Sequence, residues 1–147
     1  MTTRVLFLCT GNSARSVIAE ALLKEIGGAD FEAFSAGTDP KGLNPYTVKV
    51  LEQEHLDPAD FHSKNMNEFI GREFDYVITV CDQAAERCPI FPGDPERIHW
   101  SFPDPAAVEG AEAVKMAAFL EVLGGLRRRI EPFVIVARDA AKVAGRN

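Results

Sequence analysis

The stretch Val5–Ser16, which reads VLFLCTGNSARS, decides the fold. It opens with a continuous apolar run, as expected of a parallel strand that is buried on both faces. A short polar loop follows, and apolar residues then recur at helical spacing. These are Ala14, Ile18, Leu22 and Ile26. The pattern predicts a strand, a tight loop and a helix that stops at Gly27–Gly28.

The loop between the predicted strand and helix is a candidate anion site. Backbone N–H groups at the start of a helix have no intrahelical acceptors, and a tight loop turns them inward. Cys9 lies at the mouth of this loop, and Arg15 would close it with a planar, permanently charged fork. We expect the thiol to be ionised well below its usual pKa of about 8.5, as a nucleophile beside a cradle for a tetrahedral oxyanion. The residues expected to bind the oxyanion are Thr10, Gly11, Asn12, Ser13, Ala14, Arg15 and Ser16.

An inert, buried thiol in a phosphate-binding turn is the alternative interpretation of Cys9. The neighbouring residues favour catalysis, because Gly11 and Asn12 tolerate a left-handed backbone. Ser13 and Ser16 could donate hydrogen bonds to a thiolate or to an anion. A strand, a loop and a helix around the motif are also the context that such a catalytic loop requires.

The length and composition are those of an ordinary globular protein. At 147 residues, with 46% hydrophobic and 26% charged residues, the chain is expected to form a single catalytic domain over residues 1–147. The start of the chain does not resemble a signal peptide, and no apolar stretch approaches the ~20 residues that span a bilayer. We therefore expect a cytoplasmic protein that has no membrane partner. The net charge of −6 argues against general nucleic-acid binding.

Strands and helices alternate along the chain. Strands are predicted at residues 5–8, 31–35, 76–80 and 98–100. Helices are expected after the loop, from Asn44–Pro45 to His55, at 65–70, between Cys81 and Cys88, and from Phe119 to Ile130. The alternation is typical of an α/β fold: a doubly wound, four-stranded parallel sheet in the flavodoxin-like order 2-1-3-4, with helices on both faces. Residues after Pro132 could continue the last helix or pack elsewhere.

This topology would bring together side chains that are far apart in the sequence. Ligands of such sheets bind beyond the carboxyl ends of the strands, between strands 1 and 3, where the strand order reverses. Cys9 follows the first strand, Cys81 follows the third, and Asp104 follows the fourth. We expect these three side chains to lie in one crevice.

The same residues resemble a known family. The run from Cys9 to Ser16 and the pair Asp104–Pro105 are similar to the low-molecular-weight protein tyrosine phosphatase superfamily. Its thioredoxin-coupled arsenate reductase branch is a closer match. The segments that carry this match are Ser35-Ala36-Gly37, Val80-Cys81-Asp82, Cys88-Pro89 and His99-Trp100. The resemblance covers nearly the whole chain to about Ile130.

The resemblance implies a relay between three cysteines. Cys9 would attack arsenate, while Arg15 and the loop N–H groups stabilise the oxyanion and Asp104 protonates the leaving oxygen. Cys81 would then attack Cys9 and release arsenite, and Cys88 would attack Cys81 in turn. Thioredoxin would reduce the final disulfide, although relatives coupled to mycothiol or glutathione exist. Phosphate and sulfate would bind as analogues of arsenate, and we expect a monomer.

Two positions depart from the family pattern. Ala14 stands where many relatives carry an extra cysteine that is not part of the relay. Relatives can bind potassium beside the anion loop, through positions that match Asn12, Glu20, Ser35 and Asn65. The last of these positions is commonly Asp, so Asn65 removes a charged oxygen ligand from the implied potassium site.

Other interpretations of the remaining candidates stay open. Cys81 and Cys88 could be small core residues, although Cys88 stands in a polar stretch without an apparent apolar face to join. Asp104 could be only a turn residue between two prolines. His62 and His99 fit structural hydrogen bonding better than catalysis. The cysteines and histidines lack zinc-site spacing and no nucleotide fingerprint is present, so we expect no bound cofactor beyond potassium.

Three functions are compatible with these residues. They are arsenate reduction, hydrolysis of phosphate monoesters through a Cys9 phosphoenzyme, and non-enzymatic anion binding or redox sensing. A nucleophile, an arginine and an acid argue against a mere binding module. Phosphatase relatives usually carry aromatic residues after the Asp-Pro pair, whereas this chain has Ala106-Ala107, which weakens the phosphatase alternative. Residual phosphatase activity would still be unsurprising, since the same thiolate and arginine suit phosphate.

The segment between Cys81 and Cys88 is expected to move. Over this spacing a regular helix rises by ~10 Å, whereas a disulfide needs its Cα atoms within about 7 Å. The two thiols therefore cannot pair while the segment is helical. Its short length and few apolar anchors favour unwinding when Cys88 attacks.

Overall fold

A four-stranded parallel sheet forms the centre of the computed structural model, which describes residues 2–145. The strands are β1 (Thr3–Cys9), β2 (Phe31–Gly37), β3 (Tyr76–Thr79) and β4 (Glu96–His99). Their order is β2-β1-β3-β4, which confirms the predicted topology. Leu8 near the end of β1 lies opposite Thr79, the last residue of β3. The residues that follow these two strands therefore leave the sheet side by side.

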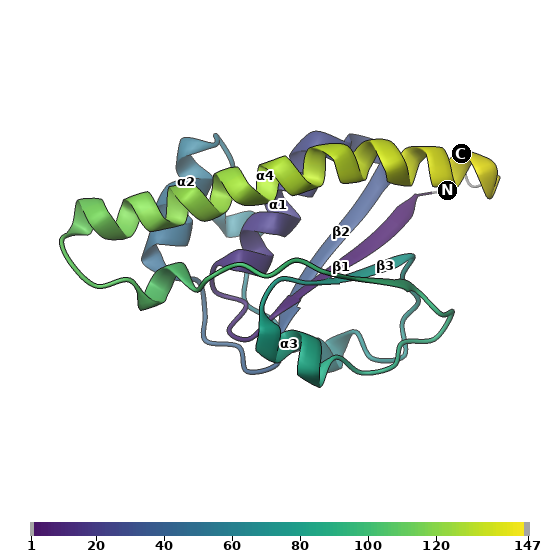
Figure 1. The fold of residues 1–147 in the computed structure, drawn as a ribbon, viewed down its shortest axis with the longest axis horizontal. Helices are drawn as coiled ribbons and strands as arrows, with labels where there is room; N and C mark the ends of the chain where they lie inside the picture. The colour runs from purple at the N-terminus through teal and green to yellow at the C-terminus, as the bar shows by residue number, and fades with distance from the viewer. Residues whose placement is uncertain (1, 146–147) are drawn as a thin grey trace.

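Helices cover both faces of the sheet, as predicted (Figure 1). They are α1 (Arg15–Gly27), α2 (Pro45–Gln53), α3 (Asp82–Arg87) and α4 (Glu112–Val143). Helices α1 and α4 pack together over one face with α2 beside them, and the short α3 lies over the other face (Figure 1). Short 3-10 turns lie between these elements: η1 (Gly28–Asp30), η2 (Pro58–Asp60), η3 (Met66–Glu68) and η4 (Pro105–Ala107).

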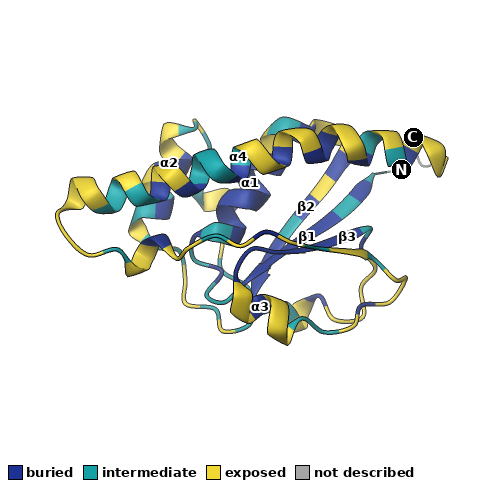
Figure 2. Ribbon diagram, in the orientation of Figure 1, coloured by how far each residue is buried: buried dark blue, intermediate teal, exposed yellow. Residues whose placement is uncertain are grey.

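The apolar run of β1 is the centre of the hydrophobic core. Its residues Val5, Leu6, Phe7 and Leu8 have no exposed surface. Burial of each such side chain contributes about 1.5–3 kcal/mol. Figure 2 shows β1 largely buried, whereas the outer faces of the helices around it are exposed. An edge strand could not be buried in this way. The apolar run therefore indicates that β1, and the loop after it, lie in the middle of the sheet.

The ends of the two helices next to the loop follow from local sequence. Helix α1 ends at Gly27, and the following Gly28 has a φ of 60°, which glycine adopts without a steric cost. Asn44 caps α2, as predicted, because its Oδ1 accepts a hydrogen bond of 2.9 Å from the Tyr46 backbone N–H.

The extents of three predicted helices are wrong. Helix α4 begins at Glu112 and not at the predicted Phe119. Helix α2 does not include His55, which has a left-handed φ of 60° and closes the helix, while the Leu56 N–H donates back to the Leu51 carbonyl oxygen at 2.9 Å. The helix expected at 65–70 is only the single turn η3, because Asn65 caps a 3-10 turn there and the chain does not continue as an α-helix.

The segment after Pro132, which the sequence left open, continues α4 to Val143. A proline inside a helix costs about 3 kcal/mol. Packing offsets this cost, because the Phe133 ring contacts the rings of Phe31, Tyr76 and Trp100. Three further residues of this part of α4 are also buried: Val134, Ala137 and Ala141. The proline is therefore tolerated because the residues after it complete the core.

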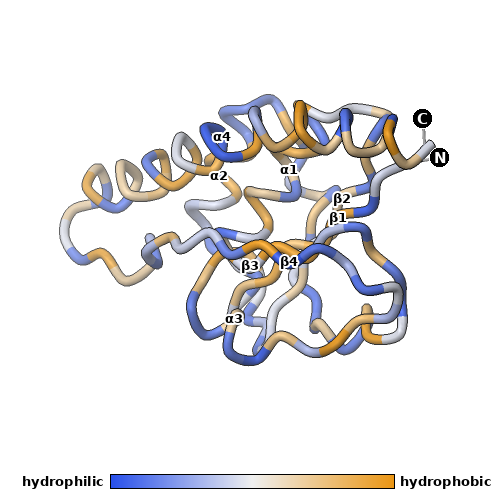
Figure 3. The backbone as a smooth tube through the Cα atoms, turned by 45° about the vertical axis from the view of Figure 1, so that its right-hand side comes forward, coloured by the Kyte–Doolittle hydropathy of each residue, from blue (hydrophilic) through white to orange (hydrophobic). Residues whose placement is uncertain are grey.

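Hydropathy differs sharply between β1 and α3. In Figure 3 the tube through β1 is mainly hydrophobic, whereas the tube through α3 is mostly hydrophilic. Ala84 is the buried residue of this helix. Among residues 2–145, none of the helices is both long enough and apolar enough to cross a membrane.

Candidate active site

The loop after β1 is held with its carbonyl oxygens facing outward. They accept hydrogen bonds of 2.9–3.1 Å from backbone N–H groups of the segment 38–44. The donor and acceptor pairs are Thr38 to Cys9, Asp39 to Thr10, Lys41 to Gly11 and Asn44 to Ser13. In a trans peptide the N–H group points away from the neighbouring carbonyl. The N–H groups of the loop are therefore turned inward, as an anion site requires.

Close contact with the end of β2 shapes the loop. A Cβ atom on Gly37 would lie 2.5 Å from the Thr10 carbonyl oxygen, so only glycine fits at this position. Asn12, and not Gly11, adopts the left-handed backbone, with a φ of 45°. Its Oδ1 accepts a hydrogen bond of 2.7 Å from the Lys64 backbone N–H, which supports this conformation.

Cys9 is buried at the floor of the loop. Its Sγ lies 2.8 Å from the Ser16 Oγ and accepts a hydrogen bond of 3.2 Å from the Asn12 backbone N–H. Burial raises the pKa of the Cys9 thiol, while the contacts with Ser16, Asn12 and Arg15 oppose the rise without cancelling it. The prediction of a pKa well below the usual range is therefore wrong for this conformation, because desolvation outweighs the loop dipoles.

Arg15 and Asp104 line one cavity of about 480 Å³ together with Cys9. Arg15 Nη1 donates a hydrogen bond of 3.0 Å to the Phe102 carbonyl oxygen. Asp104 Oδ1 accepts a hydrogen bond of 3.0 Å from the Ala106 backbone N–H and so starts η4. Asp104 is thus a turn residue that also lines the cavity. Its interpretation as a turn residue therefore does not exclude its interpretation as an acid.

Cys81 follows β3 directly and lies beside the loop. Its Sγ is 3.3 Å from the Thr10 Oγ1, and the same hydroxyl donates a hydrogen bond of 3.1 Å to the Gln83 Oε1. Thr10 thus connects the anion loop to the first turn of α3. The structure places Cys9, Cys81 and Asp104 at the carboxyl end of the sheet, as predicted. Cys9 and Asp104 line one cavity, whereas Cys81 is not among its lining residues, so the expectation of one crevice for all three side chains is not met.

Cys88 lies just beyond the other end of α3 and is half-buried. It packs against the hydrophobic core, so the expectation that it has no apolar face is wrong. The reason is that α3 ends at Arg87, and the extended backbone of Cys88 no longer follows the polar face of the helix. Burial raises the pKa of the Cys88 thiol, and the positive charge of Arg97 opposes this rise.

His99 holds the first turn of α3 from the side of β4. Its Nδ1 lies 2.7 Å from the Thr79 Oγ1, and its Nε2 lies 2.9 Å from the Asp82 Oδ1. Ser101 donates to the same carboxylate oxygen at 3.2 Å. The hydrogen bonds from His99 and Ser101 lower the pKa of Asp82. His99 thus takes part in structural hydrogen bonds, as expected from the sequence.

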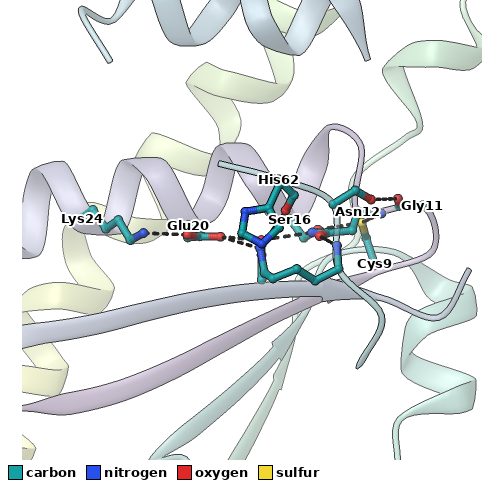
Figure 4. A network of polar contacts seen from close by, with 10 residues as sticks. Cys9, Gly11, Asn12, Ser16, Glu20, Lys24 and His62 are labelled. Atoms are coloured by element: carbon teal, nitrogen blue, oxygen red, sulfur yellow. Dashed lines mark hydrogen bonds and ion pairs between the residues drawn. The ribbon is translucent and has the colours of Figure 1, made fainter. Parts of the chain in front are cut away.

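Three of the residues implied as potassium ligands share a buried network, which Figure 4 shows. Ser35 Oγ donates to the Glu20 Oε1 at 2.5 Å, and Asn12 Nδ2 donates to the Ser35 Oγ at 3.0 Å. Two ammonium groups also face the Glu20 carboxylate. Lys24 Nζ lies 2.7 Å from Oε2, and Lys64 Nζ lies 3.8 Å from Oε1.

These contacts do not suit a potassium ion. Both carboxylate oxygens of Glu20 already face donors, and Asn12 presents its NH₂ group to the network while its oxygen accepts from Lys64. Asn65 Oδ1 accepts from the Asn67 backbone N–H at 2.8 Å and so caps η3. A hard cation needs oxygen lone pairs, and each of the implied ligand oxygens already accepts a hydrogen bond.

The family comparison agrees with the fold and the loop. The family described as "Low molecular weight phosphotyrosine protein phosphatase" matches residues 4–134. The chain belongs to the low molecular weight phosphotyrosine protein phosphatase family. The matched range includes β1 from its second residue, the other three strands, the loop after β1 and most of α4.

Curated relatives with high coverage are arsenate reductases. The protein of that name from Bacillus licheniformis is 40% identical over 129 residues, which are 88% of this chain and 93% of the relative. Those from Halalkalibacterium halodurans and Bacillus subtilis are each 38% identical over the same shares of the two chains. The resemblance to arsenate reductases of the superfamily is thereby confirmed.

Solved structures share the architecture. An arsenate reductase from Archaeoglobus fulgidus has a TM-score of 0.70 and 26% identity, over 88% of this chain and 98% of that one. A thioredoxin-dependent arsenate reductase from Corynebacterium glutamicum has a TM-score of 0.68 and 28% identity, over 92% of this chain and 63% of that one. A tyrosine phosphatase from Erwinia amylovora, 19% identical with a TM-score of 0.72, shows the same fold.

Several residues around the loop were not predicted from the sequence. Gln83 and Lys41 line the cavity, and Lys24 and Lys64 face Glu20. Lys24 had a detectable signal, because it stands one helical turn after Glu20, a spacing typical of an ion pair. Lys64 had none, since its contact with Glu20 joins a loop to a helix far away in the sequence.

Proposed function

We propose that the protein is an arsenate reductase in which Cys9, Cys81 and Cys88 act in sequence. One observation carries the proposal: a second thiol, that of Cys81, lies beside the anion loop, in contact with the Thr10 hydroxyl. A phosphatase needs only the first thiol, whereas reduction needs a second thiol within reach of the first. The curated relatives named arsenate reductase support arsenate reduction.

The first step joins sulfur to arsenic. A bound hydrogen arsenate dianion can take the thiol proton of Cys9, so the raised pKa of this residue requires no separate base. The Cys9 thiolate then attacks arsenic, and Asp104 protonates the leaving oxygen, which departs as water. Arg15 and the loop N–H groups stabilise the oxyanion charge. Arsenic remains in the +5 state in this adduct.

The second step transfers electrons. The Cys81 thiolate attacks the Cys9 Sγ and forms a disulfide, and the sulfur–arsenic bond breaks. The electron pair of that bond stays on arsenic, which leaves as arsenite in the +3 state. Two thiols are thereby oxidised to one disulfide, and arsenic gains two electrons.

The third step regenerates Cys9. Cys88 attacks the Cys81 Sγ, so Cys9 departs as a thiolate and a Cys81–Cys88 disulfide remains. An external dithiol must reduce this disulfide, and thioredoxin is the proposed reductant, as in the thioredoxin-dependent relative from Corynebacterium glutamicum. Free cysteines of this kind suit the reducing cytoplasm. We propose that a monomer carries out the reaction.

A coupled assay with arsenate, thioredoxin, thioredoxin reductase and NADPH tests the proposal. We expect NADPH oxidation with the wild-type protein and none with Cys9→Ser, because a serine hydroxyl in this loop stays protonated. Cys88→Ser should complete about one turnover and accumulate the Cys9–Cys81 disulfide, detectable by peptide mass spectrometry. Sustained thioredoxin-dependent turnover by Cys88→Ser would contradict the relay. No turnover with thioredoxin, mycothiol or glutathione systems would contradict arsenate reduction itself.

Hydrolysis of phosphate monoesters by Cys9 is the second candidate function, which the family match favours. Ala106 lines the cavity, where it offers no ring against which an aryl phosphate could stack. We therefore expect only slow hydrolysis of para-nitrophenyl phosphate. A kcat/KM for this ester above that for arsenate reduction would make phosphatase the main activity.

A further inference from the structure

The Glu20 carboxylate is an unusual feature of the interior, because a buried anion is costly without partners. Its side chain is 6% exposed, and two ammonium groups flank it. Lys24, one turn further along α1, reaches it from a half-exposed position. Lys64 faces the other carboxylate oxygen, with a side chain that is only 13% exposed. Its Nζ also donates to the His62 carbonyl oxygen at 2.7 Å.

A chain of hydrogen bonds leads from this carboxylate to Cys9. The Asn12 NH₂ group donates to the Ser35 Oγ at 3.0 Å and to the Ser16 Oγ at 2.7 Å. Since both hydroxyl oxygens accept from Asn12, their own protons are free to point onward. That of Ser35 goes to Glu20, and that of Ser16 is available to the Cys9 Sγ at 2.8 Å.

Lys64 controls this chain at two points. Its backbone N–H donates to the Asn12 Oδ1, which fixes the side-chain amide with its NH₂ group toward the two serines. Its ammonium group faces the Glu20 carboxylate that accepts from Ser35. Burial lowers the pKa of Lys64, and the negative charge of Glu20 opposes this change.

We propose that Lys64, with Lys24, is a built-in counter-ion for the Glu20 carboxylate and thereby orients the hydrogen bonds that end at Cys9. Lys64 is thus a positioning residue for the nucleophile. The two ammonium groups make a dissociable potassium ion unnecessary at this network, and their combined charge repels one. The reactivity of Cys9 is therefore independent of potassium in this protein.

The inference depends on the proposed function only in taking Cys9 as the nucleophile. Its test uses alkylation of Cys9 by iodoacetamide, followed at fixed pH by peptide mass spectrometry, together with the melting temperature. Neither measurement involves arsenate or thioredoxin. If the protein does not reduce arsenate, the alkylation result can therefore still be interpreted. If the alkylation test contradicts the role of Lys64, the proposal of arsenate reduction is unaffected.

The decisive variant is Lys64→Met, and the matched control is Lys142→Met, because Lys142 is exposed near the end of α4. In choline chloride we expect Cys9 of Lys64→Met to be alkylated roughly three- to tenfold more slowly than Cys9 of the wild type. The reason is that a positive charge near the network has been lost. Potassium chloride at the same ionic strength should restore part of this rate and of the melting temperature. The wild type and Lys142→Met should each show the same alkylation rate and the same melting temperature in the two salts.

Two results would overturn the inference. One is a saturable rise in the melting temperature or the alkylation rate of the wild type with potassium over choline. The other is a Lys64→Met protein whose Cys9 reacts like that of Lys142→Met. If Lys64→Met does not fold, Lys24→Met decides, because the Lys24 side chain is 45% exposed and that of Lys64 only 13%. Its Cys9 should then react more slowly in choline and recover in potassium, and an unchanged rate would refute the proposal.

Discussion

Arg15 Nη1 donates a hydrogen bond of 3.0 Å to the carbonyl oxygen of Phe102, two residues before Asp104. The guanidinium group thus joins the anion loop to the segment that carries the proposed acid. The remaining donors of the same planar group are available to an oxyanion in the cavity. One side chain can therefore position both the substrate and the group that protonates it.

Replacement of Arg15 by lysine should disable the site although the charge is retained. A lysine ammonium is a point charge and cannot hold the Phe102 carbonyl and two oxyanion oxygens in one plane. We expect kcat/KM for arsenate to fall on the order of 10²- to 10³-fold, the usual effect of losing an oxyanion donor. The control Arg129→Lys, on the exposed face of α4, should behave like the wild type. Near-normal kinetics of Arg15→Lys would show that Arg15 is not the anion clamp.

A methyl group at Gly37 should deform the loop. Its Cβ would lie 2.5 Å from the Thr10 carbonyl oxygen, a backbone atom that cannot move without shifting the anion site. We expect Gly37→Ala to lower stability by about 1–3 kcal/mol, as overpacking does, and to weaken sulfate binding measured by calorimetry. Gly124→Ala is the matched control, because Gly124 lies inside α4 and its Cβ would meet only the flexible Arg128 side chain. That change should stabilise the protein by about 0.5–1 kcal/mol. Equal effects of both changes would contradict this account of Gly37.

The buried thiol of Cys9 should make stability depend on alkaline pH. Burial raises its pKa in the folded protein, so the folded state keeps a proton that the unfolded state loses from about pH 8.5 upward. The contribution is fully present below that pH and is lost as the pH rises toward the folded pKa, by at most ~1.4 kcal/mol per pH unit. Urea unfolding from pH 7 to 10 should therefore show a steeper loss for the wild type than for Cys9→Ser. Parallel curves would mean that Cys9 does not titrate differently in the two states.

The fold was predictable because its signals are local and repeated. The buried run Val5–Leu8 and the strand at Tyr76–Thr79 are apolar enough to mark a parallel sheet, and the alternation with helices restricts the topology. The extent of α4 was not predictable, because Pro132 argues against a helix locally. What overrides it is the contact of Phe133 with rings on three other segments, which exists only in the folded chain.

The site was predictable in position and less so in electrostatics. The loop motif and the topology locate Cys9, Arg15 and Cys81, because parallel strands bring their carboxyl ends together. The pKa of Cys9 was expected in the wrong direction, since inward N–H groups are visible in the motif but the depth of burial is not. The pairing of Lys64 with Glu20 was equally invisible, because it depends on how a loop packs against α1.

The last prediction concerns α3, which lies between two cysteines that must form a disulfide. Cys81 and Cys88 flank this helix. A regular helix rises by ~10 Å over the separation from Cys81 to Cys88, which exceeds the about 7 Å between Cα atoms that a disulfide allows. The first turn is held by His99 and Ser101 on Asp82 and by Thr10 on Gln83, whereas the second turn has few anchors.

Oxidation should therefore unwind α3 from its carboxyl end. Once Cys88 leaves its half-buried position to attack Cys81, the hydrogen bonds of the second turn break, and the polar segment gains solvent. Hydrogen exchange of the reduced and the oxidised protein should show lost protection at Ala85 to Arg87, with unchanged protection in α2 as the internal reference. Cys88→Ser, treated with the same oxidant, should keep the protection of the reduced form. Equal protection of α3 in the reduced and the oxidised wild type would refute the unwinding, and so would a reduced structure with both Cα atoms already at disulfide distance.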